Sequence, residues 1–163
     1  MDNLALDRRH FFGIAAAATA SVAFLGARGR AAPGRFTVSH SPAEWRHLLG
    51  PERFHILREA GTERPYTSPL LKEHRTGTFD CAGCALPLFS SKTKFESGTG
   101  WPSFWKALPG AVVTRTDRSL LVARTEVLCA RCGGHLGHVF DDGPKPTGLR
   151  YCMNGLALTF KPA

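Results

Sequence analysis

Long apolar runs, internal repeats and blocks of like charge are missing from this chain of 163 residues. The main apolar run, Gly13–Leu25, is too short to span a bilayer comfortably, so we expect no stable membrane insertion. The 21 Lys and Arg residues are scattered, although the formal net charge is +8. We therefore interpret the charge as a solubility feature and expect no nucleic-acid partner.

Long helices are also expected to be few, because 17 Gly and 11 Pro favour frequent turns. Hydrophobic residues make up 43% of the chain and charged residues 21%, which is typical of a globular rather than a disordered protein. The length allows one domain plus an export segment, at a size where a bound metal still adds useful stability.

The first 31 residues have the layout of a secretory signal: a polar start, an Ala-rich apolar run and a small-residue stretch. In Asp7-Arg8-Arg9-His10-Phe11-Phe12 an Arg pair precedes two Phe, which resembles a twin-arginine signal. We predict a signal over 1–31, a linker over 32–40 and one domain over 41–163. The mature protein is then periplasmic or otherwise exported, and an uncleaved amphipathic anchor is the alternative.

Two short helices are expected at the start of the domain. Ser41-Pro42-Ala43-Glu44 is a capping box with Pro at the first helical position. The first helix should run to Leu49 and end at Gly50. The second should span Pro51–Ala60 and close at Gly61.

Short strands between turn residues are expected from about Thr76 onward. Ala111–Thr116 and Leu120–Val127 flank a turn and predict a β-hairpin. Leu149–Met153 and Leu156–Phe160 predict a second strand pair near the C-terminus.

Four of the five cysteines form two C-x-x-C pairs, Cys81 with Cys84 and Cys129 with Cys132. Together they supply the four tetrahedral thiolates that zinc prefers. Two disulfides or one thioredoxin-like redox pair are the alternatives. We favour one structural zinc, because a disulfide within C-x-x-C is short-looped and usually reactive. Four thiolates would leave no open position for substrate.

The fifth cysteine, Cys152, has no cysteine partner in the pattern. If residues 149–153 form a strand, Arg150, Cys152 and Asn154 share one face, while Tyr151 and Met153 take the other. A guanidinium two residues from a thiol favours the nucleophilic thiolate. Cys152 is therefore a candidate nucleophile rather than only a small core residue.

Two histidines and two aspartates lie close together between the second C-x-x-C pair and Cys152. His135 and His138 could supply general acid chemistry near neutral pH. The alternatives are a structural role for His135 beside the zinc and a hydrogen-bonded core position for His138. Asp141 and Asp142 also belong to an ordinary turn sequence.

An aromatic segment, Gly98–Trp105, precedes these elements. Aromatic residues in such segments are mostly core. A ring at the mouth of a site can also hold an S-methyl group through a sulfur–aromatic contact, which makes Trp101 and Phe104 candidate substrate contacts.

Four blocks resemble the peptide-methionine (R)-S-oxide reductases, the B type of methionine sulfoxide reductase, over about 41–160. The blocks are Cys81-Ala82-Gly83-Cys84, Gly98-Thr99-Gly100-Trp101-Pro102-Ser103-Phe104, Cys132-Gly133-Gly134-His135-Leu136-Gly137-His138-Val139-Phe140 and Arg150-Tyr151-Cys152-Met153-Asn154. The resemblance implies a mainly β, tent-like fold of antiparallel sheets, with short N-terminal helices and a zinc tetrathiolate opposite the active site.

The resemblance also implies roles for individual residues. Cys152 would attack the sulfoxide sulfur and become a sulfenic acid as methionine is released. The other implied catalytic residues are His138, His135, Arg150, Asp142 and Asn154, around the polar end of the substrate. Trp101 would hold the methyl group, and Phe104 is expected beside it.

This chain departs from the family pattern at two positions. Thr99 stands where many members have a resolving cysteine, so we predict a single-cysteine cycle in which an outside thiol reduces the sulfenic acid. Gly155 stands where Ser is common. We expect oxidised exported proteins or peptides as substrates, a thioredoxin-like or small-thiol reductant, and no organic cofactor.

Two other functions compete with this interpretation. A zinc-ribbon-like binding module would share the fold without catalysis. A disulfide oxidoreductase would use one of the C-x-x-C pairs, and metal binding by all four cysteines would remove its chemistry.

Overall fold

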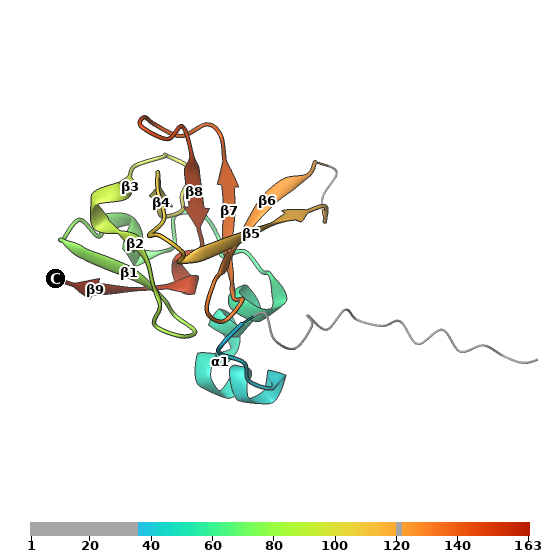
Figure 1. Ribbon diagram of the computed structural model, residues 1–163. Coiled ribbons are helices and arrows are strands. Elements are labelled where there is room, and N and C mark those ends of the chain that lie inside the picture. Colours follow the sequence, from blue (N-terminus) through green and yellow to red (C-terminus); the bar gives the residue numbers. More distant parts are fainter. Residues whose placement is uncertain (1–35, 120–121) are drawn as a thin grey trace, which may run out of the picture. The chain divides into compact units, whose positions relative to one another are not determined.

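One α-helix and two antiparallel sheets make up residues 36–119 and 122–163, the part of the chain that the computed structural model describes (Figure 1). The predicted signal over 1–31 and residues 32–35 of the predicted linker lie outside this part. Among the described helices, none is long and apolar enough to cross a membrane.

The predicted capping box opens helix α1, which spans Pro42–Glu59. The Glu44 N–H donates to Ser41 Oγ at 3.3 Å, and the Glu44 carboxylate accepts from the Ser41 N–H at 2.7 Å. These bonds satisfy two N–H groups that a helix start otherwise leaves open. The buried side chains of α1 are Trp45, Phe54, Ile56 and Leu57.

Gly50 divides α1 into the two short helices that the sequence predicts. Its φ of +69° breaks the helical backbone, and Pro51 follows directly. The end differs by one residue, because Ala60 rather than Gly61 takes the left-handed conformation, at φ 55°. The Gly61 N–H then donates to the carbonyl of His55 at 3.0 Å and completes the cap.

All strand pairs in the described residues are antiparallel. The smaller sheet has the order β2-β1-β9, with β2 at Pro87–Ser90, β1 at Gly77–Cys81 and β9 at Leu158–Pro162. The larger sheet has the order β3-β4-β8-β7-β6-β5, with β3 at Lys94–Phe95, β4 at Ser103–Phe104, β8 at Arg150–Met153, β7 at His135–Phe140, β6 at Arg124–Cys129 and β5 at Val112–Asp117. Short 3-10 helices lie at Pro69–Lys72, Ser91–Thr93 and Gly155–Ala157. The predicted mainly β class is confirmed.

The predicted hairpin is formed by β5 and β6, with shifted ends. Asp117 belongs to the first strand instead of the turn, and pairs with Arg124 at the start of the second. The predicted start at Leu120 lies outside the described residues.

The predicted pairing of the last two strands is wrong, because β8 joins the larger sheet and β9 the smaller one (Figure 1). The 3-10 helix Gly155–Ala157 redirects the chain between them. The N–H groups of Gly155 and Leu156 donate to the carboxylate of buried Glu63. A side chain thus satisfies donors that a hairpin would have paired.

Aromatic side chains fill the space between the two sheets. Phe104 of β4 stacks on Phe89 of β2 with ring centroids 4.4 Å apart, and meets Phe79 of β1 edge-on at 4.9 Å. All three rings are 0% exposed. Burial of each side chain is worth about 1.5–3 kcal/mol, so this cluster holds β4 and its neighbour β8 against the smaller sheet.

Candidate active site and metal centre

The two cysteine knuckles each follow a strand. Cys81 is the last residue of β1 and Cys129 the last residue of β6, and a tight turn after each strand carries the second cysteine of the pair. The turns are alike, because the fourth residue after the first cysteine donates its N–H back to that cysteine's carbonyl, at 2.8 Å from Ala85 and 2.9 Å from Gly133. Strands from different sheets thus bring the knuckles together.

The four sulfur atoms of this cluster fit a tetrahedral metal. All lie within 4.8 Å of one another, with 3.7 Å between Cys81 and Cys132 and 3.5 Å between Cys84 and Cys129. A cation bound at about 2.3 Å to four thiolates sets its sulfurs about 3.8 Å apart. The thiols are free, and the contacts at 3.7 and 3.5 Å each join a cysteine of one pair to a cysteine of the other, so the two-disulfide alternative does not describe this structure.

Backbone contacts and thiolate character support the cluster. The Arg58 guanidinium donates to the carbonyl of Cys132 at 2.8 and 3.0 Å, and Arg131 donates to that of Cys84 at 3.0 Å. Hydrogen bonds from the Cys129 and Cys81 thiols lower the pKa of Cys132 to about 4. Hydrogen bonding and burial raise the pKa values of Cys129 and Cys81, so two of the four thiols, Cys132 and Cys84, ionise more readily than the others. Metal binding requires thiolates, and a bound cation would have to displace the remaining protons.

Cys152 lies in a row of side chains that crosses four strands of the larger sheet. Its register partners are His138 on β7 and Ser103 on β4, and His138 in turn lies opposite Glu126 on β6. Residues directly opposite in antiparallel strands point to the same side, with Cβ atoms about 4.5–5.5 Å apart. The structure thus places His138 beside the predicted nucleophile, which is half-buried.

His138 is held by Asp117 from the neighbouring hairpin. Its Nε2 lies 2.9 Å from Asp117 Oδ2, which also accepts from Arg124 at 2.7 Å. The Ser119 side chain and N–H, followed by His138, lower the pKa of Asp117. Burial lowers the pKa of His138, which the Asp117 contact partly offsets. Because a carboxylate can only accept a hydrogen bond, the Nε2 of His138 carries the hydrogen that faces Asp117. The Nδ1 atom is then available to another partner.

His135 belongs to a second buried pair. Its Nδ1 lies 2.7 Å from the carboxylate of Glu126, which also binds Arg115. Burial alone raises the pKa of Glu126, but the hydrogen bonds from His135 and Arg115 outweigh it, so the net shift is downward. The His135 Nε2 is buried without a hydrogen-bond partner in the described part of the chain. Because its ring meets that of His138 edge-on at 5.5 Å, His135 also fixes the His138 ring.

Arg150 and Asp142, two of the predicted catalytic residues, form an ion pair. The guanidinium donates two hydrogen bonds to the carboxylate, both at 2.8 Å, and lies over the Phe140 ring at 4.4 Å. Asp142, by its hydrogen bonds, and to a smaller extent Cys152 raise the pKa of Arg150. The predicted shared face of Arg150 and Cys152 on β8 therefore places a permanent positive charge near the sulfur.

Asn154 and Trp101 are tied together through Glu63, a residue that sequence reasoning missed. The backbone N–H of Glu63 donates to Asn154 Oδ1 at 3.0 Å, and its carbonyl accepts from Trp101 Nε1 at 3.2 Å. Asn154 lies in the turn after β8 and also donates to the carbonyl of Leu136 at 3.3 Å. Because Asn154 lies beyond the strand, it does not share the face of Cys152 as predicted. Its side-chain amide instead hydrogen-bonds the backbone of Glu63 and Leu136.

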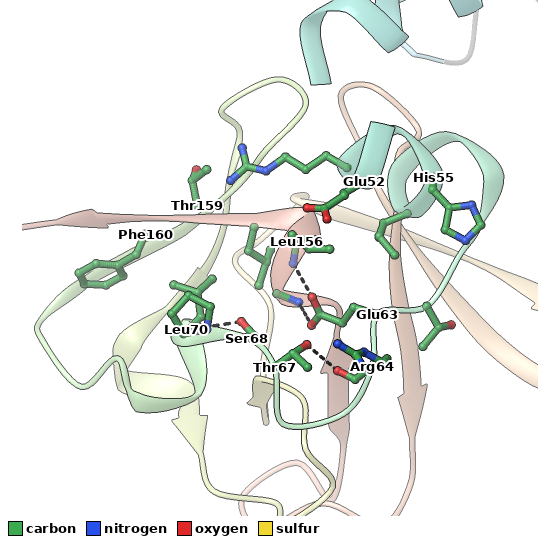
Figure 2. Close-up of a pocket in the computed structure, with 16 residues that line it drawn as sticks. Glu52, His55, Glu63, Arg64, Thr67, Ser68, Leu70, Leu156, Thr159 and Phe160 are labelled. Atoms are coloured by element: carbon green, nitrogen blue, oxygen red, sulfur yellow. Dashed lines mark hydrogen bonds between the residues drawn. The ribbon is translucent and has the colours of Figure 1, made fainter. Parts of the chain in front are cut away.

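A cavity of about 640 Å³ lies on the carboxylate side of Glu63 (Figure 2). Figure 2 shows the Glu63 carboxylate directed at the N–H of Leu156, with Glu52 and His55 of α1 at the rim. Cys152 does not line this cavity, so the cavity is distinct from the surroundings of the predicted nucleophile.

Phe104 was predicted to contact the substrate, but its ring is 0% exposed and packs between the sheets. In β4 it is Ser103, not Phe104, that lies on the same side of the sheet as Cys152, because neighbouring residues alternate.

Thr99, the position of the missing resolving cysteine, lies beside Cys152, with its Oγ1 3.7 Å from the Cys152 Sγ. The other residues that sequence reasoning missed are Asp117 and Glu126. Their contacts with His138 and His135 depend on strand register, which no local sequence pattern predicts.

Comparison with known proteins places this site in a family. The model of the SelR domain matches residues 49–162. A protein of Agrobacterium fabrum named peptide methionine sulfoxide reductase MsrB is 55% identical over 126 residues, which cover 77% of this chain and 93% of that protein. Its namesake in Thiobacillus denitrificans is 57% identical over 121 residues, 74% of this chain and 92% of that protein.

A protein of the same name in Methanosarcina barkeri is 52% identical over 125 residues, 76% of this chain and 88% of that protein. The matched regions include both cysteine knuckles and the row of side chains around Cys152. The chain therefore belongs to the SelR domain family.

Proposed function

We propose that this protein is a peptide methionine sulfoxide reductase that acts on the R epimer, with Cys152 as its nucleophile. The observation that carries the proposal is the placement of Cys152 opposite His138 and near Arg150, in a chain of the SelR family. The epimer preference rests on the family resemblance alone.

The first half-reaction transfers one oxygen atom. The Cys152 thiolate attacks the sulfoxide sulfur and forms a transient S–S bond. This bond and the sulfoxide S–O bond then break as the protonated oxygen moves to Cys152 and forms a new S–O bond there. The product is methionine, reduced by two electrons, and a sulfenic acid on Cys152, oxidised by two. Arg150 places a positive charge near the sulfur of Cys152.

The polar residues act at the sulfoxide oxygen. The Nε2 proton of His138 is bound to Asp117, which leaves Nδ1 to carry a second proton. His138 donates this Nδ1 proton to the sulfoxide oxygen. His135 and Glu126 keep the ring in place, and Asp142 keeps Arg150 in place. The Trp101 ring, fixed through Glu63, holds the S-methyl group.

The second half-reaction uses thiols from outside the chain. Thr99 occupies the position beside Cys152 where a resolving cysteine would stand, and the other four cysteines are clustered elsewhere. One external thiol condenses with the sulfenic acid to a mixed disulfide and releases water. A second thiol then frees Cys152 and leaves as the oxidised reductant.

The cysteine cluster holds zinc in this proposal. Cys81, Cys84, Cys129 and Cys132 would complete its tetrahedral shell, so the metal supplies stability rather than substrate activation. The same cluster argues against a disulfide oxidoreductase, because it leaves no free C-x-x-C pair. The contacts around Cys152 argue against a purely binding module.

The biological role that we propose is repair of exported proteins. Residues 1–31 resemble a twin-arginine signal, which exports folded proteins and would carry a loaded metal site across intact. Methionine sulfoxide disturbs packing because it makes an apolar side chain polar, and exported proteins are exposed to oxidants.

The test measures reduction of the R and S epimers of a blocked methionine sulfoxide separately, with excess dithiothreitol. The metal-loaded protein is compared with Cys152→Ser. We expect turnover of the R epimer only, and its loss in the variant. Failure of folded, metal-loaded protein to reduce either epimer would refute the proposed activity and favour the binding module.

A further inference from the structure

Three hydroxyl groups form a continuous hydrogen-bonded chain that ends at the sulfur of Cys152. Ser103 Oγ lies 2.7 Å from Ser97 Oγ, which lies 2.8 Å from Thr99 Oγ1, which lies 3.7 Å from Cys152 Sγ. Ser103 is 1% exposed and sits on β4 directly opposite Cys152. The row of hydroxyl groups thus begins at Ser103 in the sheet and leads through Thr99, in the loop before β4, back to Cys152, the residue opposite Ser103.

The buried end of this chain has two ways to place its proton. The Ser103 hydroxyl can donate to the carbonyl of Trp101 at 3.1 Å, or to Ser97. A hydroxyl both donates and accepts, and its proton rotates to suit the partners. Every hydrogen bond along the chain can therefore run in either direction without movement of a heavy atom.

Each direction matches one state of the sulfur. When Cys152 is a thiol, its S–H donates to Thr99, Thr99 to Ser97, Ser97 to Ser103, and Ser103 to the carbonyl of Trp101. When Cys152 is a thiolate, the order reverses, and Thr99 donates to the sulfur while Ser103 donates to Ser97. Hydrogen bonds to an ionised acceptor are the stronger kind, and chains of them reinforce one another.

We infer that Thr99 is a catalytic hydrogen-bond donor to the Cys152 thiolate, and that Ser97 and Ser103 are positioning residues that turn its proton toward the sulfur. The inference rests on the proposed role of Cys152 as nucleophile. It gives the position of the missing resolving cysteine a function of its own in the single-cysteine cycle.

Two charged or titratable side chains also face this sulfur, Arg150 from its own strand and His138 from β7. Neither belongs to the hydroxyl chain, and neither changes when Thr99 is replaced. Substitution of Thr99 therefore isolates the contribution of the hydroxyl from that of the surrounding charges.

The experiment measures the rate at which iodoacetamide alkylates Cys152 in the full, metal-loaded chain, followed by mass spectrometry of the peptide that contains Cys152. Rates are taken at about pH 7 and at about pH 10, where an ordinary thiol is largely ionised. Thr99→Val keeps the shape and removes the hydroxyl, Thr99→Ser keeps the hydroxyl, and Ser97→Ala removes the next donor.

In Thr99→Val we expect the rate at about pH 7 to fall roughly 3- to 10-fold, the effect of losing one typical hydrogen bond. The rate at about pH 10 should stay close to that of the parent, because the thiolate then forms without help. Thr99→Ser should retain the parent ratio of the two rates. Ser97→Ala should show a smaller fall at about pH 7.

An unchanged ratio of the two rates in Thr99→Val would overturn the donor role, and an unchanged ratio in Ser97→Ala would overturn the relay. Alkylation needs no sulfoxide, so its outcome is independent of the epimer assay. A protein that reduces neither epimer but shows the expected fall would refute the proposed function and leave the hydroxyl relay standing.

Discussion

At the scale of single residues, the space beside Gly155 is filled by the side chain of Ser68, which comes from a distant loop. The family commonly has Ser at position 155. A Cβ placed on Gly155 would collide with the hydroxyl of Ser68, which is 8% exposed and accepts a hydrogen bond from Leu70 N–H. Ser68 therefore occupies the space that a side chain at position 155 would take.

Gly155→Ser should lower the free energy of unfolding by about 1–3 kcal/mol, the usual cost of overpacking a filled site. Adding Ser68→Gly should recover most of this loss, because it vacates the volume. Urea denaturation of the two single variants and the double variant measures the coupling. If the double variant is no more stable than Gly155→Ser alone, Ser68 does not fill the space that a side chain at position 155 would take.

At the scale of elements, the turn after β8 decides where the nucleophile and its neighbours lie. The Glu63 carboxylate holds the N–H groups of Gly155 and Leu156 (Figure 2). Its backbone N–H and carbonyl bind Asn154 and Trp101. One residue from the loop after α1 thus couples the end of β8, which carries the proposed nucleophile, to the ring that we propose holds the substrate.

Glu63→Gln should lower the free energy of unfolding by about 1–3 kcal/mol and raise KM for the sulfoxide. The amide has one acceptor oxygen, so one buried N–H loses its partner, and the shifted turn moves Trp101. Urea denaturation and steady-state kinetics measure both effects. Glu52→Gln, at an exposed carboxylate on the rim of the same cavity, is the matched control. Equal effects in the two variants would argue against a special role for Glu63.

At the scale of the whole molecule, the cysteine cluster joins the two sheets. Cys81 ends β1 of the smaller sheet and Cys129 ends β6 of the larger one. The cluster is also separated from the nucleophile, because Cys129 lies three residues, roughly 10 Å, along β6 from the row that contains Cys152. The candidate metal site and the proposed nucleophile are therefore separate sites on the larger sheet.

Removal of the metal should lower the stability of the protein by several kcal/mol, because binding energy at such a site is folding energy. We expect about one zinc per chain by elemental analysis, and a lower Tm after treatment with a chelator. Cys84→Ser should lose most of the metal, whereas Cys152→Ser should keep it. Comparable metal loss in both variants would show that the cluster is not the metal site.

Local chemistry in the sequence by itself determined a large part of this protein. The capping box at Ser41, the break at Gly50 and the two C-x-x-C knuckles each depend on residues a few positions apart, which fold the same way in most surroundings. The alternation that puts Arg150 and Cys152 on one side of β8 is equally local. The pattern of short strands and the resemblance of four sequence blocks predicted the antiparallel β class, and the same local pattern made Cys152 the candidate nucleophile.

Only the tertiary structure decided which distant residues meet. Glu63 reaches Asn154 across 91 positions and Thr99 reaches Cys152 across 53, and such contacts follow from strand order rather than from spacing. The same order sent β8 and β9 to different sheets and turned Phe104 into the core. Strand register depends on how whole faces are buried, so the pairing of His138 with Asp117 and the hydroxyl chain beside Cys152 exist only in the folded molecule.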